Sequence, residues 1–381
     1  MSAVPSYFID FMRNIRLTES QITDCKTGYR SLQERLHSED DLKDIIVDSF
    51  LQGSYRRYTA VRPFRDREKS DVDIVVVTTL DRNTITPRQA LDRFNSFLEK
   101  YYKGKYKAHD RSWKIELSYV ELDLVPTSAT SRAVEELVKS TSVQNDLTLE
   151  DGPDWKLSIS WQPGRLLDTN STMEKATNDP WRKEPLWIPD REVQKWDKTH
   201  PLAQIEATQI KNSNCNGHYV NVVKCIKWWR ITQRPNPQYP KSYPLEHLCW
   251  VNCSNGVNSV AAGVVSTLES IRDTYKADAM SKRTPWVADH GVPEHNVLGR
   301  VSGNDFAAFH QHITEAATLA RHAYEEEDIQ KSVTLWKGLF GDRFPDPPTG
   351  REGDSGESPS KPGGYTPRKE PSIIGGGRYA A

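Results

Sequence analysis

Two aspartates, Asp71 and Asp73, stand two residues apart at the start of an apolar, β-branched run, DVDIVVV. In a β-strand, residues two apart lie on the same face, so this spacing places both carboxylates side by side. Two ionised carboxylates so close repel each other, and a divalent cation that prefers oxygen ligands, Mg²⁺ above all, relieves the repulsion. The alternative for an isolated pair is a strand end in solvent, with Asp73 in a surface salt bridge. The chemistry therefore depends on the residues around the pair.

Residues on both sides of the aspartate pair fit a site for phosphate groups and metal. Gln52, Gly53 and Ser54 precede a basic loop, YRRYTAVRP. Glycine lets the backbone approach a phosphate closely, and a serine hydroxyl and backbone N–H groups donate hydrogen bonds to phosphate oxygens. Downstream, Glu121 and Asp123 lie in an apolar frame and share a strand face, so spacing alone leaves open which of them is the metal ligand. The ordered combination is far more specific than any one of its parts.

The elements that hold these residues are expected to alternate between helix and strand. The expected ranges are helices over 18–36, 41–51 and 87–102 and strands over 71–77 and 113–125. Thr18 and Gln21 fit a capping box at the start of the first helix. The second helix is expected to run into Gly53 and Ser54. This order predicts helices packed on a sheet.

The rest of the chain divides into three stretches. Residues 128–200 carry tryptophans among prolines without a clear period, which predicts irregular structure. From about residue 202 the apolar spacing is helical, with helices expected over 217–231, 243–250, 257–276, 304–325 and 328–340. Residues 345–381 are rich in proline and glycine, a composition typical of a disordered tail.

Composition excludes several classes of protein. The 381 residues include 51 Lys and Arg against 52 Asp and Glu, a formal charge of −1, which argues against a protein that binds long nucleic acid through bulk charge. No apolar stretch approaches the roughly 20 residues of a membrane-spanning helix. The five scattered cysteines fit a reducing compartment. We therefore expect a cytoplasmic protein without a membrane partner.

The motifs together resemble the nucleotidyltransferase superfamily of DNA polymerase β type. Within it, the chain is similar to the cGAS/DncV-like nucleotidyltransferases (CD-NTases) of bacterial CBASS anti-phage defence, nearest to clade D. The resemblance spans about residues 8–345 and is carried by QGSYRRYTAVRP, SDVDIVVV, SYVELDLVPT, HYVNVVKCIKWWR, KSYPLEHL and LWKGLFGDRFP. It implies an α+β fold: a polymerase β-like core, a mixed sheet with helices, plus a C-terminal helical lobe. The implied domains are 1–200, the core with an N-terminal spine helix, 201–344, the helical lobe that closes the nucleotide cleft, and 345–381, the tail.

The resemblance also assigns the residues of the site. Asp71, Asp73 and Asp123 match the catalytic acids that hold two Mg²⁺ ions, with Mn²⁺ as a substitute. The matching nucleotide-binding residues are Gln52, Gly53, Ser54, Lys227, Ser242 and Tyr243. In the family, the lysine reaches the triphosphate and the tyrosine stacks on the donor base. From the residues alone, Lys227 at the edge of an apolar stripe would extend to solvent, and Tyr243 would be ordinary core. One departure is Tyr58, where many relatives have glycine.

The activity implied is template-independent synthesis of a cyclic oligonucleotide second messenger from ATP, with GTP as a further candidate substrate. A ribose hydroxyl attacks the α-phosphate, and pyrophosphate leaves; an adenine-containing cyclic trinucleotide is expected. The alternatives are a synthase of linear oligoadenylate or RNA ends, and an inactive nucleotide sensor, which the three intact acids disfavour. A downstream effector would meet the chain only through its product.

Two further features carry hypotheses of their own. An E1/E2-like enzyme would conjugate the tail through Ala381, and the alternative is a solvated tail without a role. A zinc site is disfavoured because no C-x₂-C pair occurs among its candidate ligands, which are Cys215, His218, His247, Cys249 and Cys253.

Overall fold

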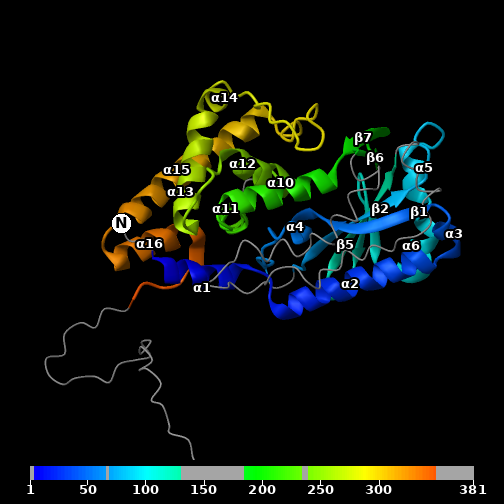
Figure 1. Cartoon of the computed structure of the whole chain (residues 1–381), viewed down its shortest axis with the longest axis horizontal. Helices are drawn as coiled ribbons and strands as arrows, with labels where there is room; N and C mark the ends of the chain where they lie inside the picture. Colours follow the sequence, from blue (N-terminus) through cyan, green and yellow to red (C-terminus); the bar gives the residue numbers. More distant parts are fainter. Residues whose placement is uncertain (1–3, 66–67, 130–183, 234–238, 349–381) are drawn as a thin grey trace, which may run out of the picture. The chain divides into compact units, whose positions relative to one another are not determined.

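The computed structural model describes residues 4–65, 68–129, 184–233 and 239–348 (Figure 1). Residues 1–347 form one compact unit. Most of the stretch expected to be irregular, and the tail with the candidate conjugation site Ala381, lie outside the described residues. In the described ranges, every helix is too short or too polar to reach across a bilayer.

A mixed seven-stranded sheet forms the frame for the acidic residues. Its strands are β1 Ile46–Gln52, β2 Asp71–Thr78, β3 Tyr106–Ala108, β4 Trp113–Glu116, β5 Glu121–Ser128, β6 Leu186–Asp190 and β7 Lys195–Thr199. The order is β1-β2-β5-β4-β3, and β6 pairs with β5 and β7. Only β2 and β5 run parallel; the other described pairs are antiparallel. The two strands that carry the predicted acids are therefore direct neighbours.

Both faces of β2 are covered, as its apolar pattern predicts. One face, with Val72, Ile74 and Val76, packs under α2 (Glu19–Ser38), α3 (Asp40–Lys43), α5 (Pro87–Asp92) and α6 (Asn95–Tyr102). The other face, with Val75 and Val77, packs against Phe50 of β1, Leu186 of β6 and Leu202. Strand alternation places Asp71 and Asp73 on this second face. At the start of α2, the predicted capping box of Thr18 and Gln21 is present.

The helical part has its own hydrophobic core, and the first helix of the chain belongs to it. The helices are α1 Pro5–Ile15, α10 Pro201–Asn214, α11 Tyr219–Thr232, α12 Ser242–Asn252, α13 Val260–Thr274, α14 Lys276–Met280, α15 Gly303–Glu325 and α16 Ile329–Phe340 (Figure 1). Phe8 of α1 meets the Trp336 ring edge-to-face at 4.9 Å between ring centres. Aromatic packing of this kind joins α1 to α16 across the length of the sequence.

The structure corrects the predicted helix over 41–51. A short α3 ends at Lys43, and Ile46–Gln52 instead form β1, which pairs with β2. The run IIVDSFLQ is β-branched and aromatic, and a short apolar run of this length fits either element until a partner strand is available. Gly53 therefore follows a strand and not a helix.

Three further expectations are revised. The predicted strand over 113–125 is a hairpin of β4 and β5, closed by a hydrogen bond from the Leu117 N–H to the Val120 carbonyl. The predicted helix over 87–102 is divided into α5 and α6. Strands β6 and β7 lie in the stretch expected to be irregular, where they form a hairpin on the sheet. The two hairpins depend on pairing between strands, which the local pattern of one strand does not specify.

Candidate active site

The register of β2 and β5 brings the acidic side chains together. In this parallel pair, Asp73 lies opposite Asp123, and Asp71 lies opposite Glu121. One carboxylate oxygen from each of Asp71, Asp73 and Asp123 lies within 4.8 Å of the other two. Glu121 is outside this group, so the geometry selects Asp123 where the spacing of the sequence left two candidates open.

The acidic triad fits a hard divalent cation. Its donors are all carboxylate oxygens, the ligands that Mg²⁺ prefers. Asp123 Oδ1 is buried and has no hydrogen-bond partner among the described residues. A buried carboxylate oxygen without a donor is costly to maintain, and a bound cation would satisfy it. The three side chains are therefore suited to hold metal.

Burial also shifts the protonation of the triad. Burial and, after it, the nearby Asp71 carboxylate together raise the pKa of Asp73 to about 6 and that of Asp123 to about 7. Arg57 and Lys114 act in the opposite direction on Asp73. Without a cation, the cluster thus retains protons up to neutral pH, because three carboxylates so close together do not all ionise readily.

A pH dependence of stability follows from these shifts. Both pKa values lie above the ordinary value of 3.8, so the folded chain binds more protons than the unfolded chain between pH 3.8 and about 7. The contribution of the triad to stability therefore decreases as the pH rises through this window. We expect the Tm of the metal-free chain, relative to that of Asp123→Asn, to fall between about pH 4 and pH 7 in differential scanning fluorimetry. Added Mg²⁺ should reverse the fall in the wild type. A difference in Tm between the wild type and Asp123→Asn that stays constant with pH would contradict the assignment of the triad.

Lys114 on β4 is a neighbour of the triad that sequence reasoning missed. Its Nζ lies 3.4 Å from Asp71 Oδ1, 3.1 Å from Glu121 Oε2 and 3.8 Å from Asp123 Oδ2. The pairing of β4 with β5 places Lys114 opposite Asp123, and the surrounding carboxylates raise the pKa of the lysine. Alternation along WKIE predicts which face of its own strand Lys114 occupies. It does not predict which strand pairs with that segment.

Gly53 is pressed against the triad. Its φ is +73°, and an added Cβ would lie 1.8 Å from Asp73 Oδ2. Gln52 pairs with Asp73 in the β1–β2 register, and Gly53 and Ser54 open the short helix α4 (Gly53–Arg56). The Ser54 carbonyl accepts hydrogen bonds from the backbone N–H groups of Thr59 and Ala60, which end the following turn. The three predicted phosphate-binding residues therefore lie directly beside the acids.

The basic loop after α4 keeps a backbone that suits glycine. Tyr58 has a φ of +59°, in the left-handed region that glycine adopts without cost. The tyrosine therefore holds a backbone conformation that glycine adopts more readily.

Arg57 links the loop to the helical part. Its Nη2 lies 3.1 Å from Glu246 Oε2, and its guanidinium carbon lies 5.2 Å from the centre of the Tyr243 ring. Lys227 donates to the same Glu246 at 2.8 Å and is buried, so it does not extend to solvent. The charge of Arg57 also acts on Asp73. Through these contacts the structure brings the predicted lysine and tyrosine into one neighbourhood with the acids.

Tyr243 is held by a partner that sequence reasoning also missed. Its hydroxyl donates to Asp289 Oδ2 at 2.6 Å, and Gln204 donates to the same oxygen at 3.3 Å. Ser242 is the first residue of α12, directly before the tyrosine. Asp289 is far away in sequence and has no local motif, whereas Glu246 could have been noticed as an acid between the buried Leu245 and Leu248.

In the described part of the chain, the cysteine and histidine candidates for a zinc site are not gathered into one cluster. Cys215 Sγ and Cys253 Sγ lie 3.8 Å apart, and both thiols are buried. Within the described ranges, the three aspartates are the only cluster of at least three His, Cys, Asp or Glu side chains close enough to share an ion.

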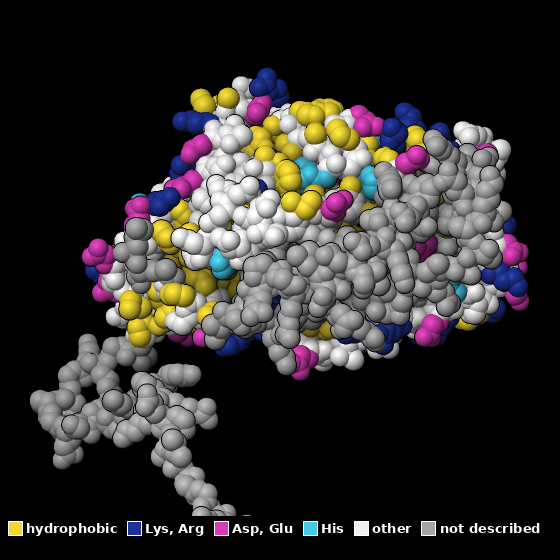
Figure 2. All heavy atoms as spheres, in the orientation of Figure 1, with side chains coloured by type: hydrophobic (Ala, Val, Ile, Leu, Met, Phe, Trp, Pro, Cys, Tyr) yellow, Lys and Arg dark blue, Asp and Glu magenta, His cyan; other side chains and the backbone are white. Residues whose placement is uncertain are grey.

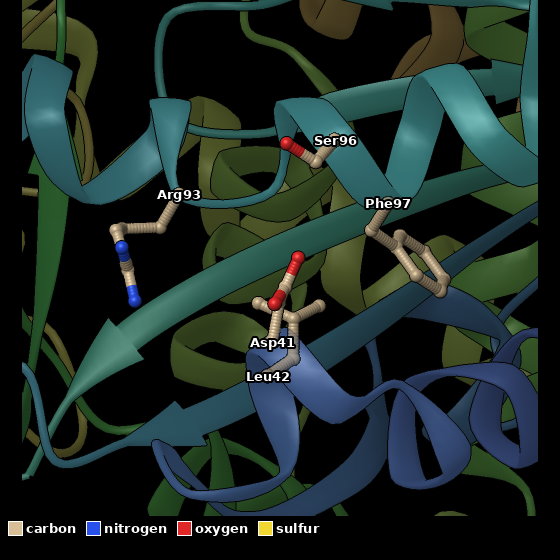
Figure 3. A pocket seen from close by; sticks show the side chains of 5 residues that line it. All are labelled: Asp41, Leu42, Arg93, Ser96 and Phe97. Atoms are coloured by element: carbon tan, nitrogen blue, oxygen red, sulfur yellow. The ribbon is translucent and has the colours of Figure 1, made fainter.

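Cavities elsewhere on the sheet part are separate from the triad. One of about 230 Å³ is lined by Asp41, Leu42, Arg93, Ser96 and Phe97, between α3 and the start of α6 (Figure 3). Leu42 and Phe97 belong to the core on the opposite face of β2 from the acids. A second, of about 410 Å³, lies by the turn between β3 and β4 and includes Arg111 and Arg300. Neither includes a residue of the triad.

Comparison with known proteins places the chain in a family. Residues 1–140 match the Second Messenger Oligonucleotide or Dinucleotide Synthetase domain. A protein of Enterobacter hormaechei named cyclic AMP-AMP-GMP synthase is 47% identical over 93% of this chain and 96% of its own length. A probable cyclic AMP-AMP-GMP nucleotide synthase of Salmonella paratyphi B is 43% identical over 96% of this chain and 97% of its own.

Solved structures share the fold at low identity. Escherichia coli CdnC with ATP aligns with a TM-score of 0.62 and 16% identity, over 90% of this chain and 98% of that one. Bradyrhizobium diazoefficiens CdnG in complex with GTP aligns with a TM-score of 0.64 and 13% identity, over 89% of this chain and 95% of that one. The predicted fold class, a nucleotidyltransferase core with a mixed sheet and added helices, is confirmed. With the two close relatives, these findings show that the chain belongs to the CD-NTases, the nucleotidyltransferases that synthesise cyclic oligonucleotides.

Proposed function

We propose that this chain makes a cyclic trinucleotide of two adenylates and one guanylate from ATP and GTP, and that Asp71, Asp73 and Asp123 carry the reaction. The main support for this assignment of the site is the cluster of three carboxylates on β2 and β5. Within it, a buried oxygen of Asp123 lacks a hydrogen-bond donor among the described residues. The choice of bases is supported by the names of the two relatives that are 47% and 43% identical.

In this proposal Asp71 and Asp73 would hold two Mg²⁺ ions, and Asp123 would help to hold the ion that activates the attacking hydroxyl. When bound, Mg²⁺ would supply positive charge that makes the ribose hydroxyl more acidic and stabilises the phosphates during transfer. The ribose oxygen forms a bond to the α-phosphorus while the bond to the β-phosphate breaks, and pyrophosphate leaves with the electron pair. Three such transfers, the last within one molecule, close the ring.

The other residues of the site bind and orient the nucleotide. Gly53 and Ser54 lie beside Asp73, where their backbone N–H groups and the Ser54 hydroxyl are available to phosphate oxygens. Lys227 and Arg57 supply positive charge. Tyr243 offers an aromatic ring for the donor base, and stacking tolerates every base. One site of this kind suits a reaction in which adenine and guanine occupy the same position in turn.

Omission of single nucleotides tests the choice of substrates. The purified chain with Mg²⁺, ATP and GTP should release pyrophosphate and form a product that resists phosphatase, and omission of either nucleotide should abolish that product. A resistant product from ATP alone would indicate a cyclic adenylate, as made by the Acinetobacter cyclic AMP-AMP-AMP synthase that is 28% identical to this chain. That result would overturn the proposed base composition.

The biological setting is part of the same proposal. We place the enzyme in the cytoplasm, in clade D, and in CBASS anti-phage signalling, where an effector reads its product. Conjugation of Ala381 by an E1/E2-like enzyme remains a separate proposal. A structural neighbour, Escherichia coli CdnC, has been solved in a complex with HORMA, so protein partners occur within the fold. On the face drawn in Figure 2, basic and acidic side chains of the described residues are interspersed, and the formal charge of the chain is −1, which supports small nucleotides and not long nucleic acid as ligands.

A further inference from the structure

Glu246 on α12 is a buried acid that joins the two parts of the chain. Its exposed fraction is 4%. Oε1 accepts a hydrogen bond from Lys227 Nζ at 2.8 Å. Oε2 accepts from Arg57 Nε at 3.2 Å and Nη2 at 3.1 Å, and from Thr59 Oγ1 at 2.7 Å. The donors come from α11 and from the loop after α4, so one carboxylate ties the phosphate loop to the helical part.

This cluster has more positive charge than negative. Two buried cations, Lys227 and Arg57, share one carboxylate, which leaves an excess of one positive charge. Burial alone would raise the pKa of Glu246, but Lys227 and Arg57 outweigh it and lower the pKa to about 2. The acid is therefore ionised at every working pH. Among the described residues, the printed contacts to Glu246 use one of the three N–H bonds of Lys227 and the Nε and Nη2 groups of Arg57, and not Arg57 Nη1.

The cluster lies where the proposed nucleotide would place its phosphates. Arg57 follows Gly53 and Ser54 in the chain, contacts the Tyr243 ring and acts electrostatically on Asp73. Glu246 itself is an anion and would repel a triphosphate. Two opposite expectations follow. If Glu246 only neutralises the cations, its removal should strengthen triphosphate binding; if it holds them in place, its removal should weaken binding.

We propose that Glu246 is a positioning residue for triphosphate binding, which holds Lys227 and Arg57 side by side so that their remaining N–H groups meet the phosphates of the donor nucleotide. This inference rests on the proposed function of the site. Without Glu246, the like charges of Lys227 and Arg57 would repel each other, and both side chains would regain rotamer freedom. When both cations are fixed before the ligand arrives, less conformational entropy is lost on binding. The position of the Glu246 carboxylate fixes them.

The test is the variant Glu246→Gln, which keeps the shape of the side chain but removes its charge. Binding is measured by fluorescence titration with a mant-labelled, non-hydrolysable ATP analogue and with mant-AMP, in the presence of Mg²⁺. We expect affinity for the ATP analogue to fall roughly 10- to 100-fold, the size of one or two lost charge-assisted contacts, and affinity for mant-AMP to stay within about twofold. In steady-state assays, KM for ATP should rise by a larger factor than kcat falls.

Asn252→Ala is the matched control for a loss of packing in the same helix. Asn252 is buried on α12, where it accepts from Ser270 at 2.9 Å and donates to the Leu248 carbonyl at 2.8 Å, outside the cluster. Both variants should lower the Tm, but only Glu246→Gln should weaken binding of the ATP analogue. Should Glu246→Gln fail to fold, Glu246→Asp, which keeps the charge but shortens the reach, should show the same selective loss to a smaller degree.

The outcomes separate this inference from the proposed function. Unchanged or tighter binding of the ATP analogue by Glu246→Gln, or an equal loss in Asn252→Ala, would overturn the positioning role. A selective loss of ATP-analogue affinity in a chain whose wild type forms no cyclic product would support the positioning role and refute the synthase proposal. A wild type that does not bind the ATP analogue would refute both.

Discussion

Replacing Asp73 with asparagine should lower the rate of nucleotidyl transfer by roughly 10³-fold or more, the scale of losing a central catalytic group. Asp73 lies between the other two acids of the site: it neighbours Asp71 along β2 and pairs with Asp123 across β5. An amide is a weaker metal ligand than a carboxylate and brings no negative charge. The same change should raise the Tm of the metal-free chain, because it removes a half-buried carboxylate that is repelled by its neighbours.

Glu121→Gln is the matched control. Glu121 lies on the same strand as Asp123 and opposite Asp71, but it is outside the triad. Its substitution should leave activity within about fivefold of the wild type, since only a contact to Lys114 is lost. Pyrophosphate release at saturating Mg²⁺ measures both variants. Substantial activity in Asp73→Asn, or an equal loss in Glu121→Gln, would show that the acids had been assigned wrongly.

The second large effect is expected at Gly53. An alanine Cβ there would lie 1.8 Å from Asp73 Oδ2 and 2.7 Å from its Cγ, so the carboxylate must move. Because misplacement of a reacting group by about 1 Å costs on the order of 10²-fold in rate, Gly53→Ala should lose at least that much activity. Metal affinity should fall with it, which a titration of Tm against Mg²⁺ concentration would reveal.

Gly256→Ala separates the clash from the strain of the backbone. Gly256 has a φ of +74°, almost equal to the +73° of Gly53, but an added Cβ there meets no atom of the described residues within 4 Å. Both variants should cost about 1 kcal/mol of stability from the left-handed conformation. Only Gly53→Ala should lose activity. Equal activity of the two variants would mean that the contact with Asp73 does not matter.

Local pattern predicted the strand of Asp71 and Asp73 and the capping box of α2, because each depends on neighbours within a few residues. It failed for β1, which is a strand only because β2 is available to pair with it. Lys114 and Asp289 were missed for the same reason: their partners are set by strand register and by the packing of distant segments. Spacing also left Glu121 and Asp123 as equal candidates for the third metal ligand. The structure distinguishes them, because only Asp123 lies close to both Asp71 and Asp73 of β2.

The most direct test of the account is the mass of the product. The wild-type chain is incubated with ATP, GTP and Mg²⁺, the mixture is treated with phosphatase, and the surviving nucleotide is identified by mass spectrometry, with Asp73→Asn in parallel. The account predicts one resistant species with the mass of a cyclic trinucleotide of two adenylates and one guanylate, absent from the variant. A ladder of linear oligonucleotides, or the same product from Asp73→Asn, would contradict it.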